Sequence, residues 1–286
     1  MSHPIVLAGN NAAAVRVLDL LLGVDVLDKA DILCIAPPGP PRHGWQVSLS
    51  RAAAERGVRC LIPADVNDEA TVAAVRAHDA KLLLSVYYTQ LFGPELLAAV
   101  DGPALNFHPS LLPRHRGTAP VIHAIAEGDE LTGLSVHHIA AGVDTGELVW
   151  QRPIPIARDD TGHVLHRKLE HLVVAAAADL MRRWLRDGTL PPSVPQQGEP
   201  TIHRSTDPPL NAIDLTAPRE RVRNVIRALA PPLPGAWVEH AGARLILRRA
   251  EPVEAPPRPA GSIDEVADGE LLLWATDGAL RAEVAA

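Results

Sequence analysis

Short apolar runs alternate with segments of helical spacing through the first half of the chain, and this alternation limits the possible folds more than any other feature. The runs of strand length are Ile5–Ala8, Ile32–Ala36, Cys60–Ile62, Leu82–Val86 and Ala104–Phe107, and the helical segments between them are Ala12–Leu22, Val47–Arg56, Asp68–His78 and Pro94–Val100. Continuously apolar strands separated by amphipathic helices are typical of a parallel sheet with helices on both faces. The sequence therefore predicts an α/β fold around a mostly parallel sheet.

The pattern changes in the second half. Leu134–Ile139 and Leu148–Ile156 are predicted strands, and Gly162–Arg186 is a predicted long amphipathic helix. Thr189–Pro209 holds six prolines, which indicates a linker or an extended wrap around the surface. The last segments are a helix at Arg219–Leu229 and short strands near Ala236–Glu239, Arg244–Arg249, Gly261–Val266, Leu271–Ala275 and Ala279–Val284. We expect an N-terminal α/β domain at 1–188, a Pro-rich linker at 189–209, and a helix with a small β-barrel-like module at 210–286.

Ligands of parallel sheets bind beyond the carboxyl ends of the strands. The loops at residues 9–11, 37–46, 87–93 and 108–118 are therefore the places to search for a site. Gly9-Asn10-Asn11 follows the first strand, but it has one glycine where the dinucleotide fingerprint needs three. We do not expect a bound NAD-type cofactor.

A polar pair stands at the end of a predicted strand. Asn106 and His108 are two residues apart, so the strand period places both side chains on one side, and Pro109 ends the strand. Downstream, Gly142-Val143-Asp144-Thr145-Gly146 allows a tight loop around one carboxylate. A carboxylate beside an imidazole fixes its tautomer, and an amide and an imidazolium can both donate to an oxyanion. A lone His or a lone Asp-Thr-Gly is usually structural, whereas the combination favours an acyl-transfer site.

Taken together, these motifs resemble those of the folate-dependent formyltransferases. The matching segments are Ser85-Val86-Tyr87-Tyr88, Asn106-Phe107-His108, Ser110-Leu111-Leu112-Pro113, Arg116-Gly117, Thr132-Gly133, Asp144-Thr145-Gly146, Val225-Ile226-Arg227-Ala228 and Pro234-Gly235-Ala236-Trp237. The resemblance covers most of the chain and is weakest over residues 10–80 and 240–286. It implies the Rossmann-like formyltransferase fold, with residues 1–188 as the catalytic domain.

The resemblance also implies a reaction. In this family N10-formyltetrahydrofolate gives its formyl group to an amine. Asn106, His108 and Asp144 match the catalytic residues: Asn106 and His108 stabilise the oxyanion, while Asp144 orients His108 and helps to move protons from the amine to N10. Neither a metal nor a covalent enzyme intermediate is implied. The expected contacts with the folate are Tyr87, Tyr88, Leu91, Ser110, Leu111, Leu112, Pro113, Ala140 and Gly142.

The amine acceptor is less constrained. Glycinamide ribonucleotide transformylases typically lack a module like residues 210–286, and the tRNA enzyme needs a basic surface, whereas these residues hold nine Arg and no Lys against eleven acids. The adjacent Tyr87-Tyr88 resembles the corresponding pair in the sugar-nucleotide N-formyltransferases. An aromatic ring at this position can stack on a base or a pterin. The alternative is that the two tyrosines pack against a helix. We expect an amino-sugar nucleotide, with hydroxyornithine of siderophore pathways as the main alternative and methionyl-tRNA after it.

Other histidines are weaker candidates. Only one of His137 and His138 can point toward the site, because side chains alternate along a strand. His115 and Arg116 follow the candidate residues and could contact a phosphate, although a solvated loop explains them equally well. His163, His166 and His171 lie on the long helix without a glutamate-bearing zinc motif, and we expect them to pack or to face solvent.

Composition bounds the partners. The formal net charge is −7 at pH 7, which argues against a nucleic-acid partner. Cys34 and Cys60 lie beside aliphatic residues and are expected to be buried free thiols in a reducing compartment. The N-terminus lacks a signal-peptide pattern, and apolar stretches such as Leu172–Ala178 are too short to span a bilayer. We therefore expect a cytoplasmic protein that acts on a small molecule and does not bind a membrane. The resemblance to the family further implies that the chain can form a homodimer.

Overall fold

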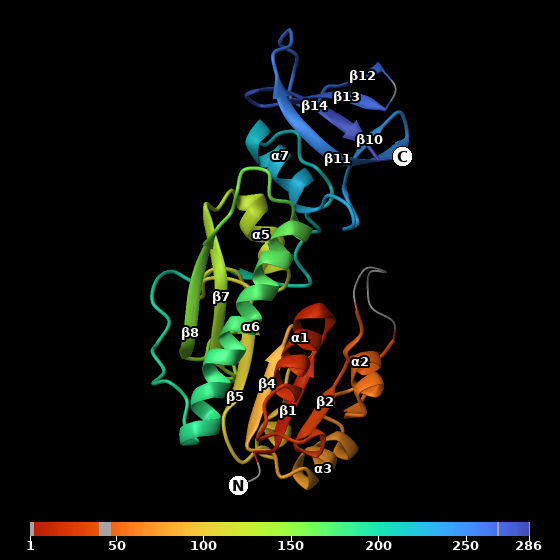
Figure 1. Cartoon of the computed structure of the whole chain (residues 1–286). Helices are drawn as coiled ribbons and strands as arrows, with labels where there is room; N and C mark the ends of the chain where they lie inside the picture. The colour runs from red at the N-terminus through yellow and green to blue at the C-terminus, as the bar shows by residue number, and fades with distance from the viewer. Residues whose placement is uncertain (1–2, 40–46, 268, 286) are drawn as a thin grey trace. The chain divides into compact units, whose positions relative to one another are not determined.

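The computed structural model describes residues 3–39, 47–267 and 269–285 of the chain (Figure 1). Of the loop expected at 37–46, residues 40–46 lie outside the described residues. The chain divides into two compact units. The first comprises residues 1–113, 133–152 and 169–200, and the second comprises 114–132, 153–168 and 201–286.

A seven-stranded sheet forms the first unit, in the order β3-β2-β1-β4-β5-β7-β8. Its strands are β1 (Ile5–Gly9), β2 (Ile32–Ile35), β3 (Arg59–Leu61), β4 (Leu82–Val86), β5 (Ala104–His108), β7 (Leu131–His138) and β8 (Leu148–Pro155). The pairs among β1 to β5 are parallel, whereas β7 runs antiparallel to β5 with Asn106 opposite His137. The predicted α/β fold with a mostly parallel sheet is confirmed.

Helices cover both faces of this sheet. One face packs against α1 (Asn11–Leu22), α2 (Leu49–Arg56) and the part of α6 (Gly162–Asp187) that begins at Leu169, and the other packs against α3 (Glu69–Ala77) and α4 (Pro94–Leu97). A short 3-10 turn, Lys29–Asp31, precedes β2. Side chains of β1 alternate between the two layers, since Ile5 and Leu7 lie in one core and Val6 and Ala8 in the other.

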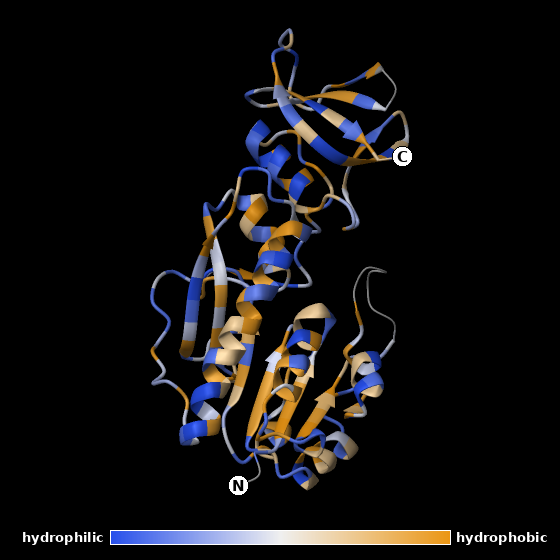
Figure 2. Cartoon of the chain, in the orientation of Figure 1, coloured by the Kyte–Doolittle hydropathy of each residue, from blue (hydrophilic) through white to orange (hydrophobic). Residues whose placement is uncertain are grey.

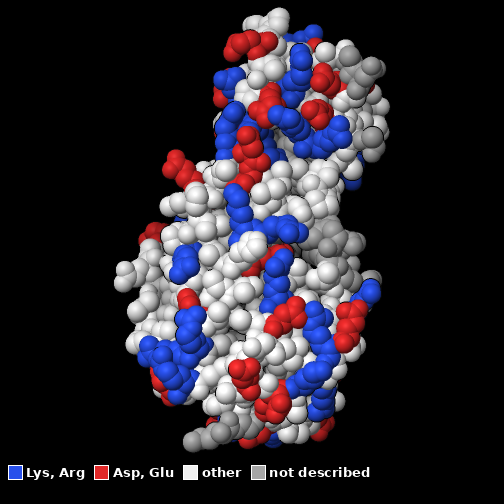
Figure 3. Space-filling model, in the orientation of Figure 1, with Lys and Arg blue, Asp and Glu red and all other residues white. Residues whose placement is uncertain are grey.

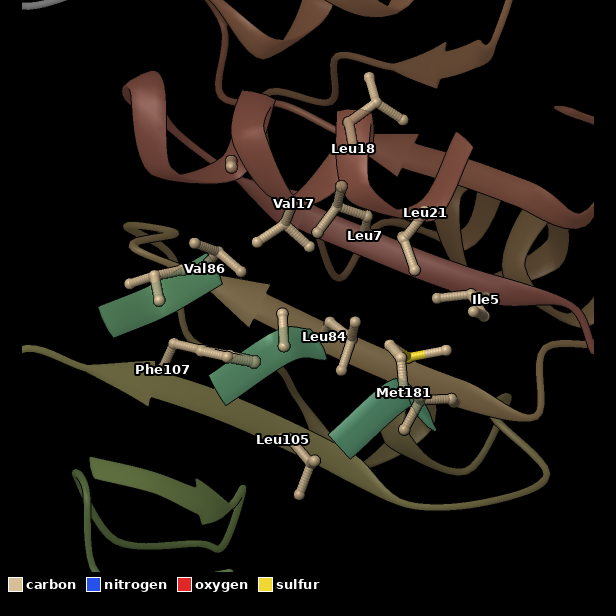
Figure 4. Close-up of a cluster of buried hydrophobic side chains, with 14 of the residues drawn as sticks. Ile5, Leu7, Val17, Leu18, Leu21, Leu84, Val86, Leu105, Phe107 and Met181 are labelled. Atoms are coloured by element: carbon tan, nitrogen blue, oxygen red, sulfur yellow. The ribbon is translucent and has the colours of Figure 1, made fainter. Parts of the chain in front are cut away.

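Burial on both faces explains why these strands are continuously apolar. Every residue of β1, β2 and β4 is buried, and these strands are almost uniformly hydrophobic in Figure 2. Figure 4 shows the aliphatic core beneath α1 and α6, where Phe107 is the single aromatic ring among the labelled residues. An aliphatic core is what a chain with 3% aromatic residues must build.

A five-stranded antiparallel sheet dominates the second unit, in the order β10-β11-β14-β13-β12. The strands are β10 (Ala236–His240), β11 (Ala243–Val253), β12 (Ile263–Ala267), β13 (Glu270–Ala275) and β14 (Gly278–Val284), and helix α7 (Arg219–Ala228) packs on the sheet. These elements match the predicted C-terminal helix and β module. Basic and acidic side chains are interspersed over this sheet on the face that Figure 3 shows.

Three elements of the second unit were not predicted: β6 (Arg116–Gly117), α5 (Pro120–Glu127) and β9 (Ile202–His203). Helix α5 packs against α7, and β6 pairs with β9 in parallel, so residues 114–132 belong to the unit that contains the C-terminal sheet. The compact units therefore do not end at the expected boundaries of 188 and 209. The second unit contains residues 114–132 and 153–168 in addition to the C-terminal residues 201–286.

The Pro-rich segment is an extended wrap. Val194 pairs with Leu148 in the first unit, and Ile202–His203 forms β9 in the second. Its backbone donors and acceptors are thus partly satisfied by other strands, as between Leu148 and Val194. None of the helices in the described ranges is both long enough and apolar enough to cross a membrane.

Candidate active site

The carboxyl end of β5 presents the predicted polar pair. Asn106 is half-buried and His108 is 5% exposed. Ser85 lies beside Asn106 on the neighbouring strand β4, and its hydroxyl donates to Asn106 Oδ1 at 2.9 Å. A hydroxyl can donate or accept, so this bond alone does not orient the amide; the carboxylate of Asp144 does, because it only accepts and therefore pairs with Nδ2. The Nδ2 group is therefore directed away from Ser85.

Asp144 meets both side chains. Asn106 Nδ2 donates to Asp144 Oδ1 at 3.2 Å, and Asp144 Oδ2 lies 3.4 Å from His108 Nδ1. The structure thus brings the predicted Asn106, His108 and Asp144 together. A carboxylate beside Nδ1 holds the ring in the tautomer that keeps a proton on that nitrogen. The other ring nitrogen, Nε2, is then the one that can serve the reacting atoms.

The loop around Asp144 needs its glycines. Asp144 itself has a positive φ of 50°, a conformation that Asp adopts more readily than most residues. A Cβ on Gly146 would collide with the carbonyl oxygen of His138, so only glycine lets the loop approach the end of β7 this closely. The close approach sets the carboxylate over β5.

Gln196 supports this loop from the Pro-rich segment. Its Nε2 donates to the carbonyl oxygens of Asp144 and Gly146 at 2.7 and 2.8 Å. Both bonds join residues about fifty positions apart, and no local pattern in the sequence marks Gln196 as part of the site. Sequence reasoning missed this residue.

His137 is a fourth member of the cluster. Its Nδ1 lies 2.8 Å from the carbonyl oxygen of His138, which can only accept, so Nδ1 carries a proton. Its Nε2 lies 3.2 Å from Asn106 Nδ2 and 3.3 Å from Asp144 Oδ1. Of the two adjacent histidines, His137 is the one whose side chain contacts Asn106 and Asp144. The pKa of its neighbour His138 is lowered by burial.

The expected folate contacts at the end of β4 differ in exposure. Tyr87 turns into the core beneath α1 and α6, and burial raises the pKa of its hydroxyl, whereas Leu91 is 73% exposed. Tyr88 packs on the opposite core and stacks on Phe92 with ring centroids 5.4 Å apart, and burial raises its pKa to about 12. The two tyrosines therefore point to opposite faces of the sheet and mainly pack against helices.

The loop from Ser110 to Pro113 is held by side chains of the neighbouring strands β7 and β8. Ser135 Oγ donates to the Ser110 carbonyl at 2.7 Å and accepts from the Leu112 amide at 3.1 Å, and Gln151 Nε2 donates to the Leu112 carbonyl at 3.0 Å. Ser110, Leu112 and Pro113 are buried and Leu111 is partly exposed. Ala140 and Gly142 are exposed at the loop that carries Asp144.

The remaining candidates lie outside the cluster. His115 and Arg116 belong to the second unit, where His115 Nε2 lies 2.7 Å from Asp129 Oδ2. His163, His166 and His171 lie on α6, with His171 exposed.

Two family models and a set of relatives match this chain. The family described as formyl transferase matches residues 46–179, and the formyl transferase C-terminal domain matches residues 208–285. A methionyl-tRNA formyltransferase from Anaeromyxobacter sp. (strain K) is 33% identical over 261 residues, which cover 90% of this chain and 82% of the relative.

Solved structures share the fold over the full length. A sugar 3N-formyltransferase, WlaRD, determined with dTDP and 5-N-formyl-THF, has a TM-score of 0.78 at 17% identity and covers 99% of this chain and 98% of its own. An N-formyltransferase from Helicobacter canadensis, in complex with folinic acid and dTDP-3-aminofucose, has a TM-score of 0.79 at 18% identity, covering 99% and 100%.

Proposed function

Because the chain belongs to the formyl transferase family, we propose that it moves a formyl group from N10-formyltetrahydrofolate to the amine of an amino-sugar nucleotide. The observation that carries the transfer chemistry is the cluster of Asn106, His108 and Asp144, with the carboxylate 3.2 Å from the amide and 3.4 Å from the imidazole. Residues 1–188 would form the catalytic domain, 189–209 the linker and 210–286 the additional module.

Addition is the first step of the proposed reaction. The amine nitrogen attacks the formyl carbon, the carbonyl electron pair moves to oxygen, and a tetrahedral oxyanion forms. Asn106 Nδ2 and, once the ring is protonated, His108 Nε2 donate hydrogen bonds to this oxyanion, which is where charge develops in the transition state. The two N–H groups of Asn106 face Asp144 and His137 in the structure, so one of them turns to the oxyanion while Ser85 stays bonded to Oδ1.

Collapse is the second step. The bond between the formyl carbon and N10 breaks, the carbonyl re-forms, N10 takes up one proton and the former amine releases one. Asp144, paired with His108 Nδ1, stabilises the imidazolium and helps to pass the proton between the two nitrogens. These steps balance without a metal and without a covalent bond to the protein.

The folate would lie along the loops that flank this cluster. Leu91, Ala140 and Gly142 are exposed on these loops and can contact the faces of the pterin ring, while the hydrogen bonds of Ser135 hold the Ser110–Pro113 loop rigid. Tyr87 is packed in the core, so we propose that it supports the loop after β4 from beneath and does not stack on the pterin.

Charge supports a sugar nucleotide over tRNA. Residues 210–286 hold nine Arg and no Lys against eleven acids, and basic and acidic side chains are interspersed on the face shown in Figure 3. A tRNA-binding module needs a basic face that neutralises phosphates. Methionyl-tRNA is the second candidate acceptor, because a methionyl-tRNA formyltransferase is 33% identical to this chain.

The test is an acceptor panel. The full chain is incubated with N10-formyltetrahydrofolate and, separately, amino-sugar nucleotides, hydroxyornithine and methionyl-tRNA, and the formylated product is measured by mass spectrometry. We expect product with an amino-sugar nucleotide. Product with hydroxyornithine or methionyl-tRNA alone would refute the acceptor, and bound folate with no transfer to any amine would refute the reaction.

A further inference from the structure

Three side chains with metal-binding atoms meet in the second unit, apart from the residues of the proposed reaction. His115 directly precedes β6, His203 ends β9, and Glu127 is the last residue of α5. One ligand atom from each lies within 4.8 Å of the others. Residues nearly ninety positions apart thus contribute to one cluster.

A carboxylate fixes the tautomer of His115. Its Nε2 lies 2.7 Å from Asp129 Oδ2, which can only accept, so Nε2 carries the proton and Nδ1 presents its lone pair. Arg114 donates to the other Asp129 oxygen at 2.6 Å and holds that carboxylate in place. A carboxylate behind a histidine in this way is the usual support of a metal-bound imidazole.

The three ligand atoms have the spacing of a coordination site. His115 Nδ1 lies 2.9 Å from His203 Nε2, while the Glu127 oxygens lie 3.6 Å from His203 Nε2 and 4.0 Å from His115 Nδ1. With zinc–ligand bonds of about 2.0–2.2 Å, the ligand atoms of a tetrahedral site lie about 3.4 Å apart. The observed separations bracket this value, so small side-chain movements suffice.

The backbone holds the two histidines in place. The His115 amide donates to Thr201 Oγ1 at 2.7 Å, although His115 has a positive φ of 54°, and Gly117 pairs with His203 in the β6–β9 ladder. A Cβ on Gly117 would collide with the His203 carbonyl, so glycine permits this pairing. The backbone thus keeps the two rings together, with His203 Nε2 donating to His115 Nδ1; an ion would replace this hydrogen bond, and His203 Nε2 would lose its proton on coordination.

His123 packs against the cluster. Its ring stacks on that of His203 with centroids 3.4 Å apart and an interplanar angle of 6°. His123 and Glu127 are four residues apart on α5, so they share one helix face.

We propose that His115 Nδ1, His203 Nε2 and Glu127 bind one Zn²⁺ ion, with Asp129 as the supporting carboxylate. Two imidazoles and one carboxylate suit zinc, and a water molecule would complete the tetrahedron. The ion would join β6, β9 and α5, so its role is to stabilise the second unit and not to take part in formyl transfer. This proposal is independent of the proposed function.

Metal titration of the full chain, prepared without an affinity tag, tests it. After dialysis against a chelator, Zn²⁺ is added and followed by calorimetry, and Co²⁺ is added and followed by visible absorption. We expect one equivalent of Zn²⁺, a tetrahedral Co²⁺ spectrum and a rise in Tm with added metal. No saturable binding, or binding with an octahedral Co²⁺ spectrum, would overturn the proposal.

Variants locate the ion. His203→Gln and Glu127→Gln each remove a ligand and should abolish stoichiometric binding, while Asp129→Asn should weaken it about 10- to 100-fold. His171→Gln, on the exposed surface of α6, is the matched control and should bind as the wild type does. Circular dichroism of each variant verifies folding, and a folded Glu127→Gln chain that retains full affinity would contradict the site even if His203→Gln fails to fold.

Discussion

Each of the proposed catalytic residues is held by another side chain of the protein. Ser85 donates to the Asn106 amide oxygen, Gln196 holds the backbone of the Asp144 loop, and Asp144 in turn faces His108. Reaction rates are sensitive to displacements of about 1 Å at such groups. Residues that never touch the substrate should therefore affect turnover.

Gln196→Ala tests this dependence. The substitution removes both hydrogen bonds to the Asp144 loop, and we expect kcat to fall about 10-fold or more, with little change in folate affinity, because the carboxylate loses its fixed position. The neighbouring Gln197 is exposed, and Gln197→Ala is the matched control. Equal steady-state kinetics for the two variants would show that Gln196 does not position the loop.

The difference between Asn106 and Gln196 shows what the sequence can predict at this scale. The strand period placed Asn106 and His108 on one side, and the two glycines marked the loop of Asp144. Gln196 and Ser85 act through contacts that form only in the folded chain. Tyr87 packs in the core, although the resemblance to the family suggests a contact with the folate. Local patterns carry no record of such long-range contacts.

At the scale of elements, the approach of the Asp144 loop to β7 is the most exacting feature. Gly146→Ala would place a Cβ against the His138 carbonyl and push the loop away, so we expect activity to fall at least about 10-fold. At Gly23, by contrast, the nearest atoms to an added Cβ lie 3.4 and 3.5 Å away. Gly23→Ala should keep wild-type kcat, and a Gly146→Ala enzyme with equal activity would contradict the steric argument.

The elements that were predicted correctly show a local pattern in the sequence, either a continuous apolar run or the spacing of an amphipathic helix. Helix α5 escaped prediction because six of its eight residues are buried, which removes the amphipathic contrast that marks a surface helix. Strands β6 and β9 have two residues each, too few for any period, and exist because Arg116–Gly117 and Ile202–His203 pair with each other. Burial and long-range pairing explain what the sequence did not indicate.

The two cysteines lie on adjacent strands β2 and β3, directly opposite each other, as free thiols. Burial raises the pKa of Cys34 to about 12 and that of Cys60 to about 11. Because the thiolate is the reactive form, we expect alkylation of the folded chain at pH 8 to be about 100-fold slower than in urea. Rates measured with iodoacetamide that are equal in both states would contradict this burial.

At the scale of the whole molecule, the charge balance bears on the acceptor. The chain has a formal net charge of −7, and its C-terminal module is slightly acidic. We expect fluorescence anisotropy to give a Kd for tRNA no tighter than about 10⁻⁶ M at physiological salt, the range of non-specific binding. Tighter binding that weakens steeply with added salt would favour methionyl-tRNA as the acceptor.

The central claim is that Asn106, His108 and Asp144 perform formyl transfer, and His108→Ala tests it most directly. Single-turnover transfer from N10-formyltetrahydrofolate should fall by about 10²- to 10³-fold or more, because the variant loses a donor to the oxyanion, while folate affinity stays within a few-fold. His171→Ala, on the exposed face of α6, should transfer at the wild-type rate. Near wild-type transfer by a folded His108→Ala chain would contradict the account.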